Sequence, residues 1–154
     1  DQQSLEKRCE KLGPEPFNSK FNTSYIFNNL KNKKKNVKNF LLDQNFISGI
    51  GNIYASEILY LSRINPAKEG RLINKAECKK NFKNSRLVLQ NAINRGGSSI
   101  RDFKDVSGKK GSFQKNFKVY QREGSKCKRI DCKGLIQKKN ISNRSTFFCT
   151  FCQK

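Results

Sequence analysis

Residues 41–66 read LLDQNFISGIGNIYASEILYLSRINP and hold the most informative pattern in this sequence. Apolar side chains recur there at helical spacing: Tyr54, Ile58 and Leu61. This spacing places them on one face of a helix. Pro66 cannot continue the helix, because its ring removes a backbone donor and clashes with the preceding turn. The stretch therefore predicts a helix that begins just after Gly51 and ends before Pro66.

The start of this predicted helix carries groups that suit an anion. Gly49 and Gly51 leave the backbone accessible, and the unpaired N–H groups of a first helical turn lie at its positive end. Asn52 adds a side-chain amide beside them. On its own, a Gly-x-Gly sequence before a helix is more typical of a tight turn than of a binding site. In a strongly basic chain, the anion that these residues suit is a DNA phosphate.

The composition points to a polyanionic partner. The chain has 154 residues, with 33 lysines and arginines against 12 aspartates and glutamates, a net charge of +21 and a pI near 10.0. An excess of this size attracts nucleic acid. The chain is also rich in Asn, Ile and Phe, and an AT-rich genome, which pushes neutral positions toward Lys, is a second explanation for part of the charge. The length suits one ordinary domain, or one domain that carries a small appendage.

Several absences limit the function. No run of 18 apolar residues is present, so we expect no membrane span, and no apolar signal-peptide core stands near the start. The lack of histidine excludes an imidazole base from this chain. The chain has no methionine, at Asp1 or later, so we expect it to be the C-terminal part of a longer protein.

The rest of the sequence predicts a helical part, a long loop and a small β part. We expect further helices at residues 4–12, 23–31, 37–41 and 75–95. The last of these has Asn74 as its cap and Glu77 as the partner in a capping box, and it ends at Gly96 and Gly97. The glycine-rich residues 96–116 predict a loop. Alternating runs predict strands at 117–121, 134–139 and 145–151.

Four cysteines near the C-terminus have the spacing of a zinc site. Four residues separate Cys127 from Cys132, two separate Cys149 from Cys152, and sixteen lie between the pairs. Each pair supplies two thiolates from a tight turn, and four thiolates complete a structural, tetrahedral Zn²⁺ site. The segment is too short to fold on its own apolar core, and zinc binding offsets that deficit. Two disulfides are the alternative, but disulfides are rare in intracellular proteins, and the other features favour an intracellular protein.

Taken in order, these segments resemble the formamidopyrimidine-DNA glycosylase family over essentially the whole chain. Residues 41–66 are similar to its helix-two-turns-helix element, with LGPEPF ahead of it and GGSSIRDF, GSFQKNFKVYQREG and NRSTFFCTFCQK after it. The related endonuclease VIII enzymes share the helical element and the finger, but LGPEP and GGSSIRDF are closer to the formamidopyrimidine branch. The resemblance implies a mainly α fold with a helix-two-turns-helix domain at 1–96, a lesion-capping loop and connector at 97–120, and a β-hairpin zinc finger at 121–154.

The resemblance also assigns roles to single positions. Asn52 matches the asparagine whose amide binds a phosphate beside the lesion. Lys34 matches a basic residue at a DNA-contacting position, although it lies in a run of three lysines of which any can be solvated. Arg144 matches the catalytic finger arginine, which contacts phosphates at the flipped nucleotide and is assigned as proton donor in the second elimination. Because a guanidinium is a poor acid at neutral pH, a bidentate phosphate clamp is the physical role we expect.

Members of this family are bifunctional base-excision repair enzymes. They flip an oxidised purine, such as formamidopyrimidine or 8-oxoguanine, out of the duplex, cut its glycosidic bond and break the strand at the abasic site. Their nucleophile is an N-terminal proline, on a domain none of whose positions is in this sequence. The resemblance therefore implies the DNA-binding C-terminal part of a DNA glycosylase and AP lyase, which alone binds damaged double-stranded DNA without excising bases.

The same resemblance implies a bacterial, cytoplasmic, nucleoid-associated monomer. Three other interpretations stay open: part of an endonuclease VIII-like glycosylase, a complete non-catalytic zinc-ribbon DNA-binding protein, and a zinc-ribbon RNA-binding module of the ribosomal type. The helix-two-turns-helix pattern argues against the last, because such modules do not need it.

Overall fold

The computed structural model describes residues 12–94 and 117–154, which form a helical body followed by a two-stranded hairpin. Its elements are α2 (Thr23–Leu30), α3 (Val37–Leu42), α4 (Asn52–Leu61), the 3₁₀ helix η1 (Gly70–Leu72), α5 (Lys75–Asn94), β1 (Ile136–Ile141) and β2 (Arg144–Cys149). The expected mainly α fold with a C-terminal hairpin is confirmed. The helix expected at 4–12 lies almost wholly, and the loop expected at 96–116 wholly, outside the described residues.

Helices α2, α3 and α5 begin at asparagine caps, whereas α4 has Gly51 as its cap. The side chain of Asn22 accepts a hydrogen bond from Tyr25 N at 2.9 Å and starts α2. At α5 the predicted capping box is present: Glu77 N donates to Asn74 Oδ1 at 2.8 Å, and Asn74 N donates back to Glu77 Oε1 at 3.1 Å. These side-chain acceptors satisfy N–H groups that have no partner within the first turn of a helix.

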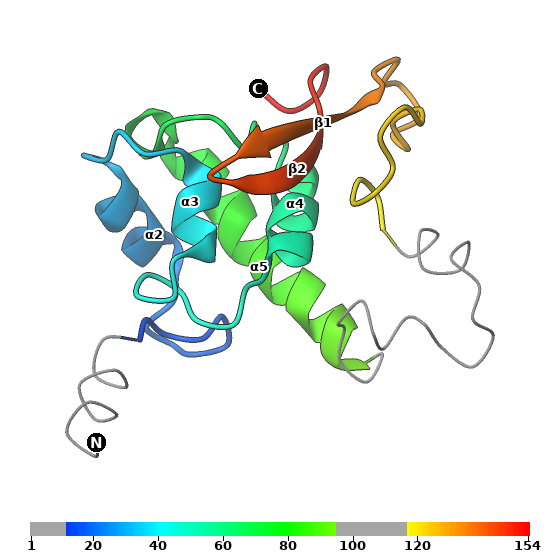
Figure 1. Cartoon of the computed structure of the whole chain (residues 1–154). Coiled ribbons are helices and arrows are strands. Elements are labelled where there is room, and N and C mark those ends of the chain that lie inside the picture. The colour runs from blue at the N-terminus through cyan, green and yellow to red at the C-terminus, as the bar shows by residue number, and fades with distance from the viewer. Residues whose placement is uncertain (1–11, 95–116) are drawn as a thin grey trace.

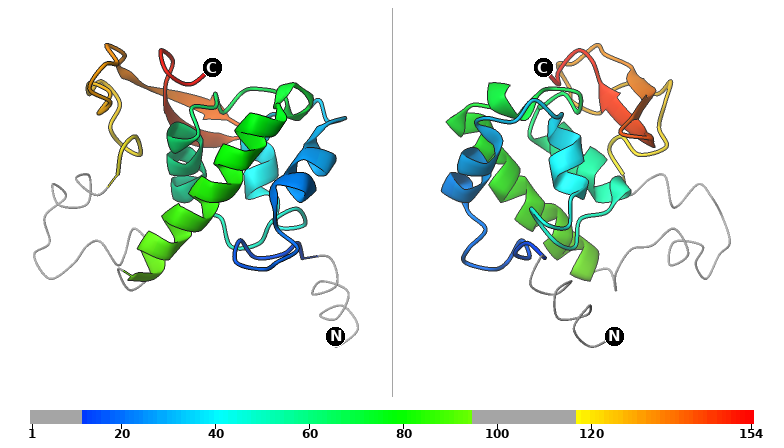
Figure 2. Two further views of the ribbon diagram at one scale, coloured as in Figure 1. Left: turned by 180° about the vertical axis from the view of Figure 1, so that it is seen from behind. Right: turned by 60° about the vertical axis from the view of Figure 1, so that its left-hand side comes forward.

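Helix α4 lies at the centre of the molecule, where α3, α5 and the hairpin pack around it (Figure 1 and Figure 2). Its residues are buried continuously from Ala55 to Tyr60, so more than the predicted single face is covered. The long helix α5 also packs against α2. Apolar side chains from the four α-helices and the loops between them are buried in one core, which contains no hairpin residue: Phe21, Ile26, Leu30, Val37, Leu41, Ile47, Ile50, Ile58, Leu59 and Ile64, with Cys78 and Val88 from α5.

A tight turn carries the chain from α3 into α4. Gly49 has a φ of +94°, a left-handed conformation that glycine adopts without strain. Its N–H donates to Gln44 Oε1 at 3.1 Å, which closes the turn ahead of α4. The predicted helix start just after Gly51 is confirmed, and α4 ends at Leu61, before Pro66.

The hairpin is antiparallel, and Ile141 pairs with Arg144 at its tip. The two residues between them, Ser142 and Asn143, both have positive φ angles, of 55° and 61°. A two-residue turn with positive φ at both residues has a twist that matches the right-handed twist of the two strands it joins. The hairpin contributes to a second apolar cluster, which also includes a residue of α4: Tyr60, Phe117, Val119, Tyr120, Cys127, Ile136, Phe147 and Cys149.

The strand predicted at residues 117–121 is wrong. Phe117, Val119 and Tyr120 are buried in the second cluster, which explains the alternating pattern, but the backbone there forms turns. The N–H groups of residues 118–120 donate to the carboxylate of Glu57 and are therefore not free to join a strand ladder. Within the two described ranges, no helix has the length and apolar character needed to span a membrane.

Candidate nucleic-acid interface and metal site

The N-terminus of α4 meets the tip of the hairpin. Gly51 caps α4 without a side-chain hydrogen bond, and a Cβ atom built on it would have no heavy atom within 4 Å. The backbone N–H groups of the first turn of α4 therefore lack a side-chain cap. Beside them, Asn52 Nδ2 donates to the carbonyl oxygen of Ser145 at 3.0 Å. Asn52 Oδ1 is buried and has no hydrogen-bond partner among the described residues.

Arg144 is exposed at the start of β2, and hydrogen bonds hold the backbone around it in place. Thr146 Oγ1 donates to the Arg144 carbonyl at 3.0 Å and accepts a hydrogen bond from Lys38 Nζ at 2.6 Å. At the turn, Asn36 Nδ2 donates to Ser142 Oγ at 3.2 Å. These contacts, together with that of Asn52, bring Arg144 to the N-terminal ends of α3 and α4.

Lys38 is a functional candidate that the sequence analysis missed. Its side chain is fully buried on α3 and forms no ion pair among the residues described. Burial, and then the positive charge of Arg144, lower the pKa of Lys38 from its ordinary 10.5 to about 8. The signal was present, because Lys38 lies three residues before the buried Leu41 and thus on the apolar face of α3.

Lys34 lies away from these contacts, in the loop between α2 and α3. It is exposed, and its side chain makes no hydrogen bond or ion pair with any described residue. Its loop is ordered by two backbone bonds, from Gly70 N to Lys35 O at 2.9 Å and from Arg71 N to Lys33 O at 2.8 Å. The structure does not bring Lys34 into contact with Asn52 or Arg144, so its role at DNA stays a prediction.

Glu57, the acidic residue of α4, anchors the backbone that leads into the finger. Its carboxylate accepts hydrogen bonds from Lys118 N at 2.6 Å, Val119 N at 2.9 Å and Tyr120 N at 3.1 Å. Burial raises the pKa of Glu57, and the three N–H donors oppose that rise. Glu57 therefore links α4 to the finger by three charge-assisted hydrogen bonds.

The four cysteines converge as the sequence predicted. Their Sγ atoms all lie within 4.8 Å of one another, and two approaches between the pairs measure 3.9 Å, from Cys127 to Cys152, and 3.6 Å, from Cys132 to Cys149. All four are free thiols, so the alternative of two disulfides is not what the structure shows. The set can hold a metal ion with four sulfur ligands.

The backbone around this cluster also fits a metal site. Gly134 leaves room for the sulfurs, since a Cβ atom there would lie 2.5 Å from Cys149 Sγ and 3.4 Å from Cys132 Sγ. Two neighbours that the sequence analysis did not identify reach the sulfurs from outside: Tyr60 Oη lies 3.1 Å from Cys127 Sγ, and Arg129 donates to Cys152 Sγ at 2.9 Å. Both are polar contacts between residues far apart in sequence, which no local pattern reveals.

Comparisons with known proteins agree with this geometry. Residues 12–104 match the family model described as the formamidopyrimidine-DNA glycosylase H2TH domain. The formamidopyrimidine-DNA glycosylase of Prochlorococcus marinus subsp. pastoris is 46% identical over 143 residues, which cover 93% of this chain and 48% of that protein. The one from Azorhizobium caulinodans is 39% identical over 160 residues, covering 100% of this chain and 55% of that protein.

Solved structures show the same relationship. The Lactococcus lactis Fpg in complex with DNA containing an abasic site superposes with a TM-score of 0.84 at 36% identity, covering 99% of this chain and 56% of that one. A MutM complex with DNA containing carbocyclic 8-oxo-G superposes with a TM-score of 0.82 at 36% identity, covering 99% and 54%. The chain spans about half the length of the curated relatives it matches. This chain belongs to the formamidopyrimidine-DNA glycosylase family and carries its H2TH domain.

Proposed function

We propose that this chain is the DNA-binding part of a base-excision repair glycosylase and binds phosphates of damaged double-stranded DNA where α4 meets the hairpin tip. The observation that carries this proposal is the hydrogen bond from Asn52 Nδ2 to Ser145 O, because it places the uncapped start of α4 beside Arg144. Backbone N–H groups at a helix N-terminus and a planar guanidinium are both well suited to phosphate oxygens.

Each group has a separate task in this proposal. The first-turn N–H groups of α4, which Gly49 and Gly51 leave accessible, and the amide of Asn52 orient one phosphate. Arg144 clamps a phosphate through two parallel N–H donors. Lys38 positions the start of β2. It donates a hydrogen bond to Thr146 Oγ1, which in turn donates to the carbonyl of Arg144. Lys34 adds positive charge from its exposed loop.

The reaction of the whole protein is also a proposal. Relatives in solved complexes hold DNA with an abasic site or with carbocyclic 8-oxo-G. We infer that the substrate class is the same, oxidised purines in duplex DNA, and that the reaction is base excision followed by strand cleavage. In the second elimination, Arg144 stabilises the charge of the departing phosphate as a hydrogen-bond donor, since a guanidinium does not readily release a proton at neutral pH.

Cys127, Cys132, Cys149 and Cys152 hold one structural Zn²⁺ in this proposal. Four thiolates fill a tetrahedral shell and leave no position open for a substrate. The metal joins the two ends of the finger and so supports the strand that carries Arg144. We further propose that the protein acts as a monomer on the bacterial chromosome in the cytoplasm, and that the domain divisions lie near residues 96 and 120.

Binding of the zinc-loaded chain to a labelled duplex with one tetrahydrofuran abasic analogue, measured by fluorescence anisotropy from low to high salt, tests the proposal. Because each phosphate contact releases counterions, the logarithm of the affinity should fall linearly with that of salt, with a slope of roughly −0.9 for each phosphate neutralised. A flat salt dependence would contradict binding through phosphates.

A further inference from the structure

Helix α4 supplies a hydrogen-bond donor to the metal site. Tyr60, in the last turn of α4, is only 2% exposed, and its hydroxyl lies 3.1 Å from Cys127 Sγ. Either atom of this pair can donate when Cys127 is a thiol, but a thiolate that holds the proposed zinc has no proton, so the Tyr60 hydroxyl is the donor when the metal is bound. The ring of Tyr60 packs in the apolar cluster of the finger. A residue of the helical body thus takes part in the polar environment of the cysteines.

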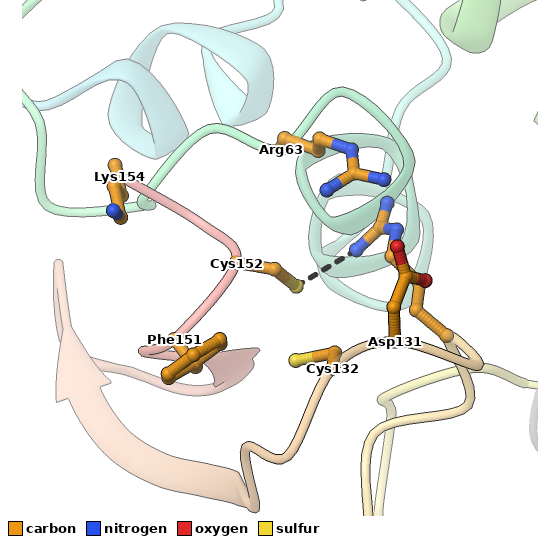
Figure 3. Close-up of a pocket in the computed structure, with 7 residues that line it drawn as sticks. Arg63, Asp131, Cys132, Phe151, Cys152 and Lys154 are labelled. Carbon is orange, nitrogen blue, oxygen red and sulfur yellow. Dashed lines mark hydrogen bonds between the residues drawn. The ribbon is translucent and has the colours of Figure 1, made fainter.

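Arg129 makes a second contact of this kind. It lies in the four-residue segment between Cys127 and Cys132, whose turn is closed by a hydrogen bond from Cys132 N to Arg129 O at 3.1 Å. One arm of its guanidinium donates to Cys152 Sγ at 2.9 Å, the dashed line in Figure 3, and the other donates to the carbonyl of Tyr60 at 2.6 Å. The guanidinium carbon lies 4.1 Å from the centre of the Tyr60 ring.

Every partner of Arg129 favours a cation. Zn²⁺ with four thiolates has a net negative charge, the carbonyl of Tyr60 belongs to the negative end of the α4 dipole, and the face of an aromatic ring attracts positive charge. The forked guanidinium reaches sulfur and carbonyl at once, which a lysine ammonium on a flexible stem does not do in a fixed geometry. The wider spacing of the first cysteine pair supplies the position from which this arginine reaches both.

The contact between Arg129 and Cys152 lies on the side where the cysteine cluster faces a cavity. Cys132 and Cys152 are half-buried and line a cavity of about 290 Å³ together with Arg129 and Phe151 (Figure 3). Cys127 and Cys149 are buried away from it. Arg129 therefore donates to one of the two thiolates that a chelator or an electrophile reaches from this side.

We propose that Tyr60 and Arg129 are positioning residues of the metal site, which retain the ion by donating hydrogen bonds to Cys127 and Cys152 and thereby tie metal retention to the docking of the finger on α4. The inference rests on the proposed zinc site. Donors to ligand atoms orient the ligands, and their loss typically weakens metal affinity about 10- to 100-fold. Here one donor, Tyr60, lies at the end of α4, and the other, Arg129, lies between Cys127 and Cys132 and also binds the carbonyl of Tyr60. The finger therefore holds its metal best when it is packed against α4.

The test uses the full zinc-loaded chain and its Tyr60→Phe and Arg129→Gln variants. Zinc transfer to an excess of a chromogenic chelator is followed over time, and we expect release to be about tenfold faster in each variant. Cobalt-substituted protein gives a second readout. Removing a donor makes the sulfur easier to oxidise, so the sulfur-to-cobalt charge-transfer band should move to longer wavelength.

Two matched variants control for general damage. Tyr25→Phe removes another hydroxyl that is hydrogen-bonded within the protein, to Phe46 O at 2.5 Å, far from the sulfurs. Arg86→Gln removes a guanidinium that donates to three backbone carbonyls and lies 4.4 Å from the Phe82 ring. Both should release zinc at the wild-type rate and leave the cobalt band in place.

The outcomes separate the two proposals. If the wild-type chain takes up no zinc, the proposed metal site is wrong and the inference falls with it. If it takes up zinc and folded Tyr60→Phe and Arg129→Gln release it no faster than the controls, the positioning role is refuted while the zinc site stands. Should Arg129→Gln not fold, Tyr60→Phe decides alone, because it removes one oxygen atom and leaves the ring packed.

Discussion

A single lysine beneath the hairpin makes the stability of this chain depend on pH in an unusual direction. Between pH 8 and 10.5 the folded protein holds Lys38 neutral while the unfolded chain holds it charged. The unfolded state then binds more protons, so the free energy of unfolding should rise with pH across this window, by about 3 kcal/mol if the shift is fully expressed. Below pH 8 the lysine is charged in both states, and its burial penalty is constant.

Lys38→Met tests this directly. The variant has no buried charge, so at pH 7 it should be more stable than the wild type, and the difference in unfolding free energy should shrink from pH 8 to pH 10. Urea unfolding at several pH values measures it, and Lys34→Met, which removes an exposed lysine, is the control. A difference that is the same at every pH would show that Lys38 does not change its protonation on folding.

Gly134 is a second position at which a single change should have a large effect, because one added carbon atom there would collide with the sulfur cluster. In Gly134→Ala, the new Cβ would lie 2.5 Å from Cys149 Sγ and 2.7 Å from Phe151 Cβ, so the sulfur cluster must open. We expect the variant to lose most of its bound zinc, measured as metal per chain after dialysis. Gly51→Ala adds the same atom where nothing lies within 4 Å and should keep its zinc. Full zinc content in Gly134→Ala would contradict the described packing of the site.

Among the elements, the joint between α4 and the finger depends on one carboxylate. Glu57 has two acceptor oxygens for the three N–H donors of residues 118–120, whereas the amide of Gln has one oxygen and would direct an NH₂ group at the backbone. Glu57→Gln should therefore cost about 1–3 kcal/mol for each buried N–H left unpaired. Hydrogen exchange of these amides should accelerate as well.

The matched change is Glu15→Gln, at an exposed glutamate whose side chain makes no hydrogen bond among the described residues. It should leave both the thermal unfolding temperature and the exchange of residues 118–120 unchanged. Equal stability of the two variants would mean that Glu57 is not the anchor we describe.

Local pattern predicted the elements better than the contacts between them. The helix after Gly51, the capping box at Asn74 and the two finger strands follow from spacing, caps and alternation over a few residues. The false strand at 117–121 shows the limit, since its alternation comes from packing while its N–H groups bind a carboxylate about 60 residues earlier. Lys38 contacts Thr146 across 108 residues, and no local pattern encodes such a pairing.

The candidate site was predictable to the same extent. Spacing alone identified the four cysteines, whose sulfurs do converge. The positions of Asn52 and Arg144 followed from the family resemblance, and the structure places Asn52 against the residue next to Arg144. Tyr60 and Arg129 escaped notice because their contacts depend on how the finger sits on α4.

The two apolar clusters predict that the helical body and the finger respond differently to removal of the metal. The cluster of the helical body contains no residue of the finger, whereas that of the finger includes two cysteines among its buried residues. Chelation should therefore abolish the hydrogen-exchange protection of β1 and β2, while amides in α2 and α5 stay protected. Protection of β1 and β2 that survives chelation would show that the hairpin does not need the ion.

A comparison of two Asn→Asp variants tests whether the start of α4 and the hairpin tip form one phosphate site. Asn52→Asp places a negative charge at this site, and Asn84→Asp makes the same change on α5, where Asn84 Nδ2 donates to Ser62 Oγ at 3.1 Å. We would measure the affinity of zinc-loaded proteins for an abasic-analogue duplex at one salt concentration. We expect Asn52→Asp to bind at least about tenfold more weakly than the wild type, or by about 1.4 kcal/mol, and Asn84→Asp to bind about as tightly as the wild type. Equal affinities for the two variants would contradict a shared phosphate site.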